Sequence, residues 1–399
     1  MNRKLLDFLG LKRNTAALLG MVILVGMGER MAERFLPIYL LALGGGALSI
    51  GYLNGTNNLL NAIYSFIGGY ASDRVGYKRA LLFFNLLAIF GYVIVIVFPY
   101  WQAVIVGSIF FLSWTAISLP ATMDLVAKNL PSHKRTMGVS MHSLVRRIPM
   151  GLGPIIGGTF MVWYGETTGV RIAFGVAIAF AIVALVVQQR MIEQEKRIHA
   201  EKNPLKLWTL MSPELKHLLL SDILIRFCEQ IPYAFVVVWS MKGDGVSAIE
   251  FGVLTAIEMA TSAAMYIPTA YLADRGTRKP FVIITFWFFT LFPLVLLFSH
   301  TFVWLVVAFI IRGLKEFGEP TRKALILELS PENRKAGMFG VYYLVRDVIV
   351  SVAAFVGAFL WEISPEVNFL TAFAFGAIGS ILFMIFGRDV AASQQSATV

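Results

Sequence analysis

Twelve apolar stretches, each long enough to cross a lipid bilayer, divide this chain of 399 residues. A helix needs about 20 apolar residues to span the hydrocarbon core, because it rises only about 1.5 Å per residue. The predicted spans are 15–41, 48–72, 78–98, 101–127, 136–162 and 170–189 in the first half, and 216–240, 248–273, 279–298, 302–328, 335–361 and 367–387 in the second. We therefore predict an all-α integral membrane protein.

The composition agrees with this prediction and excludes a soluble fold. Apolar residues make up 57% of the chain and charged residues only 15%, whereas the exterior of a soluble protein of this size must stay polar. The net charge of +10 could indicate nucleic-acid binding, but the placement of the positive residues follows membrane topology. No nucleic-acid partner is predicted.

Lysine and arginine gather in alternate links between the spans, as expected for loops that stay in the cytoplasm. The other links hold little beyond Arg171 and Lys242. We therefore predict a multi-pass protein of the cell membrane, the inner membrane in a bacterium, with both termini in the cytoplasm. The predicted domains are a six-helix bundle at 1–189, a cytoplasmic linker at 190–215, and a six-helix bundle with a short tail at 216–399.

The link between the second and third spans reads Gly69-Tyr70-Ala71-Ser72-Asp73-Arg74-Val75-Gly76-Tyr77-Lys78-Arg79, and a related run occurs about 200 residues later at 271–279. Both runs resemble the signature G-x-L-A-D-R-x-G-R-K of the major facilitator superfamily. The resemblance implies a fold of twelve helices in two pseudo-symmetric six-helix bundles, with transport by alternating access. It also resembles, more narrowly, the proton-coupled drug and solute antiporters among the twelve-helix members.

The repeat continues beyond this motif. Arg146 matches Arg346, and Arg30-x-x-Glu33 in the first span resembles Arg226-x-x-Glu229 in the seventh. Internal duplication predicts a substrate path between the two halves near the middle of the membrane.

In the family the loop signature latches the halves on the cytoplasmic side while the transporter faces outward. The resemblance implies this role for Gly69, Asp73, Arg74, Gly76, Asp124, Asp274 and Arg275, where Asp124 lies at a depth that allows pairing with Arg74. Asp73 and Arg74 are expected just after the end of a helix. The alternative is that these charges only fix the topology.

The fifth span contains Gly153-Pro154-Ile155-Ile156-Gly157-Gly158, which is similar to the G-P-x-x-G-G core of a motif in proton-coupled drug antiporters. Proline removes a backbone donor, and glycine permits close packing against a neighbouring helix. The resemblance favours export over import, although Ser140 and Pro149 stand where that motif has glycine. The alternative is helix packing without any bearing on direction.

Ionisable residues at mid-membrane depth are the most informative candidates for function. Such a group costs about 2.5–3.5 kcal/mol to insert, so it faces a partner or a wet cavity. The candidates for proton coupling are Glu33, Glu229, Glu258 and Glu316. Glu258 is preferred because it has no basic neighbour in its own helix. The alternative for each glutamate is a permanent ion pair.

Further charged, amide and aromatic residues are predicted to line the substrate cavity. They are Glu29, Arg30, Arg34, Asn57, Asn58, Asn61, Arg146, Arg226, Arg312, Glu319, Tyr342 and Arg346. In the tenth span Arg312, Lys315, Glu316 and Glu319 have spacings of three and four, which predict one helix face. For the asparagines and tyrosines the alternative is contact between helices.

These observations predict a secondary active transporter that exports a small amphipathic or charged organic compound, driven by the proton gradient. The alternatives are a proton-coupled importer of organic anions or zwitterions, a lipid or lysolipid flippase, and a membrane sensor that binds without transport. No enzyme, cofactor or metal site is predicted, and the single cysteine, Cys228, excludes an intramolecular disulfide. The expected partners are a small-molecule substrate, protons and the bilayer, and the chain is expected to be a monomer.

Overall fold

The computed structural model describes residues 13–75, 77–111, 135–191, 208–273, 278–331 and 335–388, and within these ranges the regular structure is helical. The first residue of every predicted span lies within four residues of the first residue of a helix. The helices are α2 (Arg13–Glu33), α3 (Leu36–Ala42), α4 (Ala47–Val75), α5 (Tyr77–Val97), α6 (Trp101–Phe111), α8 (Arg135–Tyr164), α9 (Glu166–Met191), α10 (Pro213–Gln230), α11 (Phe235–Val238), the π-helix η3 (Trp239–Gly243), α12 (Ala248–Ala273), α13 (Lys279–Leu297), α14 (Phe302–Leu314), α15 (Glu319–Glu328), α16 (Lys335–Ile363) and α17 (Pro365–Phe386).

The chemistry of the exposed surface identifies a multi-pass membrane protein. Within the described residues, six helices are long and apolar enough to cross a membrane, and three shorter helices are also apolar. Aromatic side chains are exposed at or next to the links between helices, among them Tyr100, Trp163 near the end of α8 and Trp304 near the start of α14. Aromatic rings are enriched at the boundary between lipid and water, so these links have the composition of a membrane interface.

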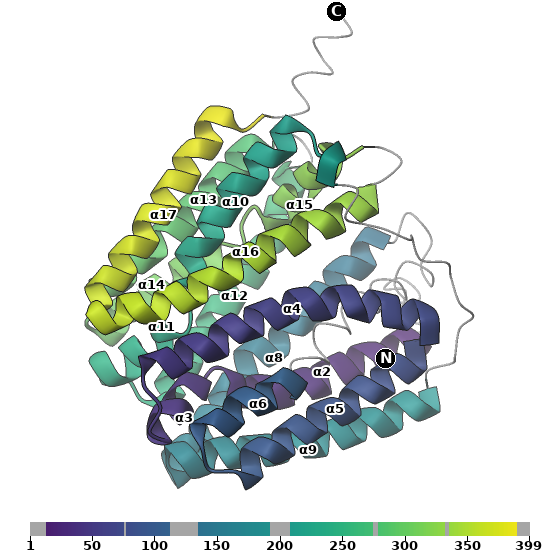
Figure 1. Ribbon diagram of the computed structural model, residues 1–399, viewed down its shortest axis with the longest axis vertical. Coiled ribbons are helices and arrows are strands. Elements are labelled where there is room, and N and C mark those ends of the chain that lie inside the picture. Colours follow the sequence, from purple (N-terminus) through teal and green to yellow (C-terminus); the bar gives the residue numbers. More distant parts are fainter. Residues whose placement is uncertain are drawn as a thin grey trace, which may run out of the picture. The chain divides into compact units, whose positions relative to one another are not determined.

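The chain forms two compact units (Figure 1). Unit 1 consists of Met1–Ser49, Leu60–Ala200 and Ser247–Ala256, and unit 2 of Ile50–Leu59, Glu201–Val246 and Ile257–Val399. Part of α4 therefore belongs to unit 2, and the start of α12 belongs to unit 1. The predicted linker lies mostly in 192–207, outside the described residues.

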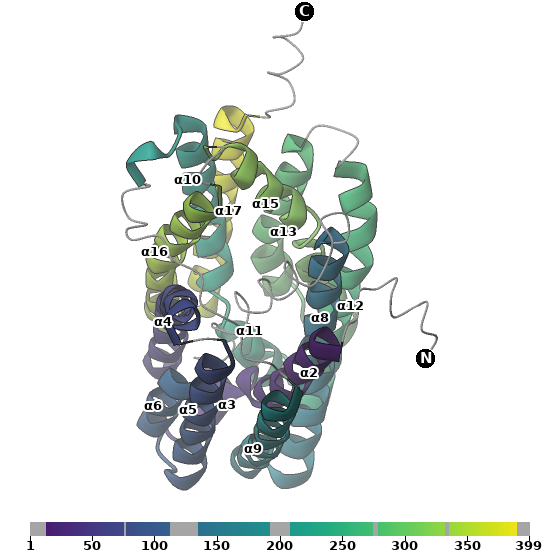
Figure 2. The same ribbon diagram turned by 90° about the vertical axis from the view of Figure 1, so that its right-hand side faces the viewer.

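In unit 1, α2 packs against both α8 and α9, and α5 lies beside α6 and α9, as the labelled ribbons of Figures 1 and 2 show. Small residues allow the close approach of these helices. A Cβ atom on Gly28 of α2 would lie 2.7 Å from the Cα of Ala177 in α9, so a larger side chain does not fit there. Backbones that approach this closely are typical of helices packed in a membrane.

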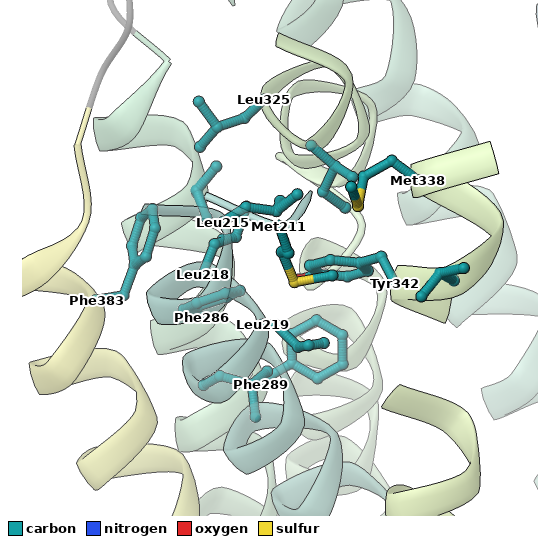
Figure 3. Close-up of a cluster of buried hydrophobic side chains, with 14 residues drawn as sticks. Met211, Leu215, Leu218, Leu219, Phe286, Phe289, Leu325, Met338, Tyr342 and Phe383 are labelled. Carbon is teal, nitrogen blue, oxygen red and sulfur yellow. The ribbon is translucent and has the colours of Figure 1, made fainter. Parts of the chain in front are cut away.

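In unit 2, α10 and α13 pack against α17, and α16 lies along α10. Buried side chains fill the space between these helices, and ten of them are labelled in Figure 3. Leu215 and Leu218 extend from α10 toward Phe286 of α13 and Phe383 of α17. This apolar cluster holds the first turns of α10 in place. Asp222 lies one turn after Leu218 in the same helix.

The two units repeat the same packing details, as expected for an internal duplication. In unit 1, Gly157 of α8 lies directly against the backbone carbonyl of Met31, and in unit 2, Gly357 of α16 lies against that of Ile231. The lysine of each loop signature also repeats its contact with the last helix of its half. Lys78 donates to the carbonyl of Gln189 at 2.8 Å, and Lys279 donates to that of Met384 at 2.9 Å.

Within the described residues, three predicted spans are interrupted rather than continuous. The first span breaks between α2 and α3, the seventh between α10 and α11, and the tenth between α14 and α15. A proline follows each break closely or lies in it, at Pro37, Pro232 and Pro320. Proline lacks the N–H group that a continuous helix needs, so these breaks have a local cause. Interrupted helices in transporters commonly form binding sites, because the break frees backbone polar groups.

Two expectations about helix geometry are wrong. Arg312, Lys315, Glu316 and Glu319 do not share one continuous helix face, because the turn at Lys315–Gly318 separates α14 from α15. Gly318 fits this turn closely, since a Cβ atom there would lie 2.5 Å from the carbonyl oxygen of Phe281.

The loop signature also differs from expectation. Helix α4 continues to Val75, so Asp73 and Arg74 belong to its last turn instead of following its end, and Gly69 lies one turn earlier. The latch residues Gly76, Asp124, Asp274 and Arg275 lie outside the described residues. The latch therefore stays a prediction.

Candidate functional site

Unit 2 contains a continuous group of buried and half-buried charged side chains, which we call the charge network. Its members come from five helices and from the break between α14 and α15. They are Asp222, Arg226, Glu229, Glu258, Arg312, Lys315, Glu319, Arg322 and Arg346. Charges at this depth are expensive unless they are paired or serve a wet cavity, so the network is the strongest candidate for a functional site in unit 2.

The first part of the network surrounds Asp222 of α10, whose side chain is 1% exposed. Arg322 forms an ion pair with Asp222, and Nη1 of Arg346 lies 3.3 Å from its Oδ2 atom. The hydroxyl of Tyr342 donates to the same oxygen at 3.0 Å. A carboxylate held by two guanidinium groups and a hydroxyl is well compensated, which is typical of a permanent buried ion pair.

Arg322 also binds Glu319 through both carboxylate oxygens, at 2.8 and 2.7 Å from Nη2. The guanidinium of Arg346 lies 4.1 Å from the centre of the Tyr343 ring, close enough for a cation–π contact. Arg322 and Arg346 thus have partners in the protein on several sides, and this part of the network joins α10, α15 and α16.

The second part of the network is an alternating row of acids and bases. Glu229 accepts from Nη1 of Arg226 at 2.6 Å and from Nζ of Lys315 at 2.6 Å. Lys315 Nζ lies 3.8 Å from Oε1 of Glu258, and the same oxygen lies 3.5 Å from Nε of Arg312. Glu258 therefore has basic partners after all, and α14 and the turn after it supply them. Spacing within its own helix could not reveal that contact.

A small pocket adjoins this row. In this conformation its interior volume is about 10 Å³, room for about one water molecule, and its lining consists of Glu229, Tyr233, Val236, Phe289, Phe292, Arg312 and Lys315. Charged groups of both signs and aromatic rings thus meet at one opening. The chemistry of this lining, rather than the present size of the pocket, matches a small organic molecule that has both an ionised group and an apolar part.

Four predicted residues of unit 1, Glu29, Arg30, Glu33 and Arg34, lie at or just before the break between α2 and α3. Arg30 and Glu33 form an ion pair one turn apart, and Glu29 is buried. Arg34 and Arg146 are half-buried, and both interact with other groups. The Arg30–Glu33 pair repeats the Arg226–Glu229 pair of unit 2, as the sequence predicts.

The predicted asparagines do not form one group. Asn58 donates to the side-chain oxygen of Gln230 at 2.8 Å, while Asn61 is exposed and belongs to unit 1. The Oδ1 atom of Asn57 is buried without a hydrogen-bond partner in the described part of the chain. Glu316, the remaining proton-coupling candidate, is half-buried in the turn between α14 and α15.

The glycines of the fifth span make close contacts within unit 1. A Cβ atom on Gly153 would lie 2.8 Å from Cβ of Arg30, and Gly157 touches the carbonyl of Met31. Gly158 touches the carbonyl of Ala248, and Pro154 lies within α8. The motif thus packs α8 against α2. Helix packing is one of the two roles that the sequence allows for this motif, and a role in the direction of transport is the other.

The sequence-based selection missed two central members of the network, Asp222 and Arg322. Both carried a usable signal. Asp222 lies one helical turn before Arg226, and Arg322 lies three residues after Glu319, so each extends a charged helix face that had already been recognised. Lys315 was noted in the tenth span but was not selected, although it bridges two of the candidate glutamates.

Comparisons with known proteins agree with the fold. The sequence model of the Major Facilitator Superfamily matches residues 18–239 and 218–398. A protein of Methanocaldococcus jannaschii named as an uncharacterized MFS-type transporter is 24% identical over 380 residues, which cover 90% of this chain and 91% of that protein.

Solved structures of transporters share the fold at low identity. A variant of nucleoside transporter NupG superposes with a TM-score of 0.82 at 11% identity, over 94% of this chain and 100% of that chain. A peptide transporter POT in complex with sulfate gives a TM-score of 0.76 at 15% identity, over 94% and 93% of the two chains. The human organic anion transporter MFSD10 gives 0.68 at 14% identity, over 93% and 98%. Because the family model covers nearly all of both halves, the chain belongs to the Major Facilitator Superfamily.

Proposed function

We propose that this transporter couples the export of a small amphipathic or charged organic compound to the entry of protons. The observation that carries the proposal is the row Glu229–Lys315–Glu258–Arg312 beside the pocket of unit 2. Two carboxylates share one lysine there, and a substrate that enters the pocket meets Glu229, Lys315 and Arg312.

A proton and a substrate can compete in this row. Protonation of Glu229 or Glu258 removes the negative charge of that carboxylate. Its ion pair is then weakened, with Lys315 in the case of Glu229, and with Lys315 and Arg312 in the case of Glu258. A released cation can then bind an anionic group of a substrate, so proton uptake and substrate binding become linked. Such linkage is what a coupled transporter needs, and it requires no cofactor beyond the proton gradient.

Export is the direction that the motif in α8 favours. The importer of organic anions or zwitterions remains the second candidate, since the same row of charges would serve it equally. Counterflow in membrane vesicles of known orientation distinguishes the two, because an exporter accumulates substrate in inside-out vesicles when their lumen is acidic.

The test of coupling is proton movement in proteoliposomes that contain a pH-sensitive dye, with a panel of anions, zwitterions and cations outside. We expect a compound-dependent pH change that Glu229→Gln or Glu258→Gln abolishes. Glu214→Gln is the matched control, because Glu214 forms an exposed pair with Arg388 at the end of α10. Coupling that persists unchanged in both network variants would refute the proposal.

The proposed topology places both termini in the cytoplasm. After Cys228→Ser removes the only cysteine, Lys242→Cys and Lys202→Cys provide single labels on opposite predicted sides. An impermeant maleimide added to intact cells should label Lys242→Cys and leave Lys202→Cys unlabelled. The reverse pattern would overturn this orientation.

A further inference from the structure

Arg312 differs from the other arginines at the centre of the charge network in how its guanidinium is used. Its side chain is only 3% exposed, and its one ion pair with a described residue joins Nε to Glu258 at 3.5 Å. The guanidinium makes no hydrogen bond with any residue that the structure describes. By contrast, Arg322 donates to Asp222 and to both oxygens of Glu319.

A buried guanidinium has five N–H donors, and leaving them unused is expensive. Aromatic rings lie against Arg312, with the centres of Phe292, Phe309 and Tyr233 at 5.1, 5.6 and 5.7 Å from Cζ. These ring contacts stabilise the positive charge, but the rings themselves supply no oxygen acceptor for its N–H groups.

The side chain of Arg312 adjoins the pocket of unit 2. Arg312 is one of its lining residues, together with Tyr233, Phe289 and Phe292. The only carboxylate in the lining, Glu229, is already held by Arg226 and Lys315 at 2.6 Å each. The group in the lining that still lacks hydrogen-bond partners is therefore a cation, and aromatic walls stand beside it.

We propose that Arg312 binds the carboxylate group of the substrate, and that the apolar part of the substrate lies against Phe289, Phe292 and Tyr233. The ligand class is a small organic acid with an aromatic or other apolar group. A guanidinium edge can bind both oxygens of a carboxylate at once, which an ammonium group cannot do. This inference rests on the proposed function, because it assigns the substrate class of the same site.

The test is equilibrium binding of 3-phenylpropanoate to the purified full-length protein in detergent, without any proton gradient. Its amide is a neutral ligand of the same shape, and acetate has the carboxylate without the ring. For the wild-type protein we expect binding of 3-phenylpropanoate to be at least tenfold tighter than binding of either comparison compound. Equal binding of acid and amide, or no carboxylate-dependent binding, would overturn the inference without the need for any variant.

The variants locate the site. Arg312→Lys keeps the charge beside Glu258 but loses the two-point geometry, and we expect it to weaken binding of the acid at least tenfold. Arg312→Gln should remove the preference for acid over amide. Arg388→Gln is the control, since Arg388 is 77% exposed at the end of α17 and its variant should bind as the wild type does. Gel filtration verifies that each variant is folded.

Separate measurements of binding and of flux distinguish the assignment of Arg312 from the proposed proton-coupled transport. If Arg312-dependent binding occurs but proteoliposomes show no proton-coupled flux, the assignment of Arg312 holds and the proposed transport fails. If proton-coupled flux of some compound is observed and Arg312→Gln leaves both flux and binding unchanged, the proposed function holds and the assignment of Arg312 is wrong.

Discussion

Gly357 of α16 lies so close to the backbone carbonyl of Ile231 that a side chain has no room between the two helices. Gly357→Ala should therefore push α16 away from α10 and destabilise the protein by about 1–3 kcal/mol, the usual range for overpacking. Gly340→Ala is a matched control in the same helix, because no atom lies within 4 Å of its added Cβ. Thermal unfolding in detergent measures both, and equal unfolding temperatures for the two variants would contradict the packing role.

Removal of Asp222 should destabilise unit 2 far more than removal of an exposed acid. Asp222→Asn removes the buried carboxylate that Arg322 and Arg346 share and leaves each with one acidic partner, Glu319 or Asp347, so the loss should reach up to about 3–5 kcal/mol, the cost of breaking a buried pair. Unfolding in detergent should show this loss, with Glu214→Gln near the wild type. A variant of Asp222 as stable as Glu214→Gln would mean that the arginines find other partners.

Glu229 and Lys315 should act as one unit. Their atoms Oε1 and Nζ lie 2.6 Å apart, so the effects of Glu229→Gln and Lys315→Met on stability should not add. We expect a coupling energy of about 0.5–3 kcal/mol in a double-mutant cycle. The pair Glu229 and Arg388 has no contact and provides the control cycle, which should be additive. Additivity in both cycles would exclude a direct interaction of Glu229 with Lys315.

Asp244, which follows η3, should make stability depend on pH. Burial raises the pKa of Asp244 above its usual value, and the hydrogen bond from His300 at 3.4 Å lowers it only in part. A raised pKa means that the ionised carboxylate destabilises the folded state at neutral pH, and that this penalty disappears as the pH falls through the raised value. Asp244→Asn should therefore be more stable than the wild type at pH 7, with a difference that shrinks on acidification. Unfolding midpoints across this pH range measure it, and a difference that grows as the pH falls would refute the assignment.

The sequence was sufficient for the helices and their repetition, because both depend on local chemistry. Apolar length sets the spans, and the pairs Arg30–Glu33 and Arg226–Glu229 occur within single helical turns, where spacing alone predicts contact. The break at Lys315–Gly318 was missed because apolar length does not register a single interrupted turn, although Gly318 and Pro320 signal one.

The partners of Glu258 were beyond prediction from spacing. They come from α14 and the turn that follows it, about 55 residues later, and only the packing of α12 against this region decides which charges meet. The same holds for Asp222 and Arg322, which are 100 residues apart. Local spacing supplied the candidates, whereas tertiary packing decided which of them became neighbours.

The interruption between α14 and α15 has a mechanical consequence. A continuous helix behaves as a stiff rod, so a tilt at one end is transmitted to the other. At Lys315–Gly318 the regular hydrogen-bond ladder is already interrupted, and the two segments can swing about this joint without breaking a full helix. Lys315 lies at the pivot itself, 2.6 Å from Glu229 and 3.8 Å from Glu258, so a small rotation there changes which carboxylate it reaches.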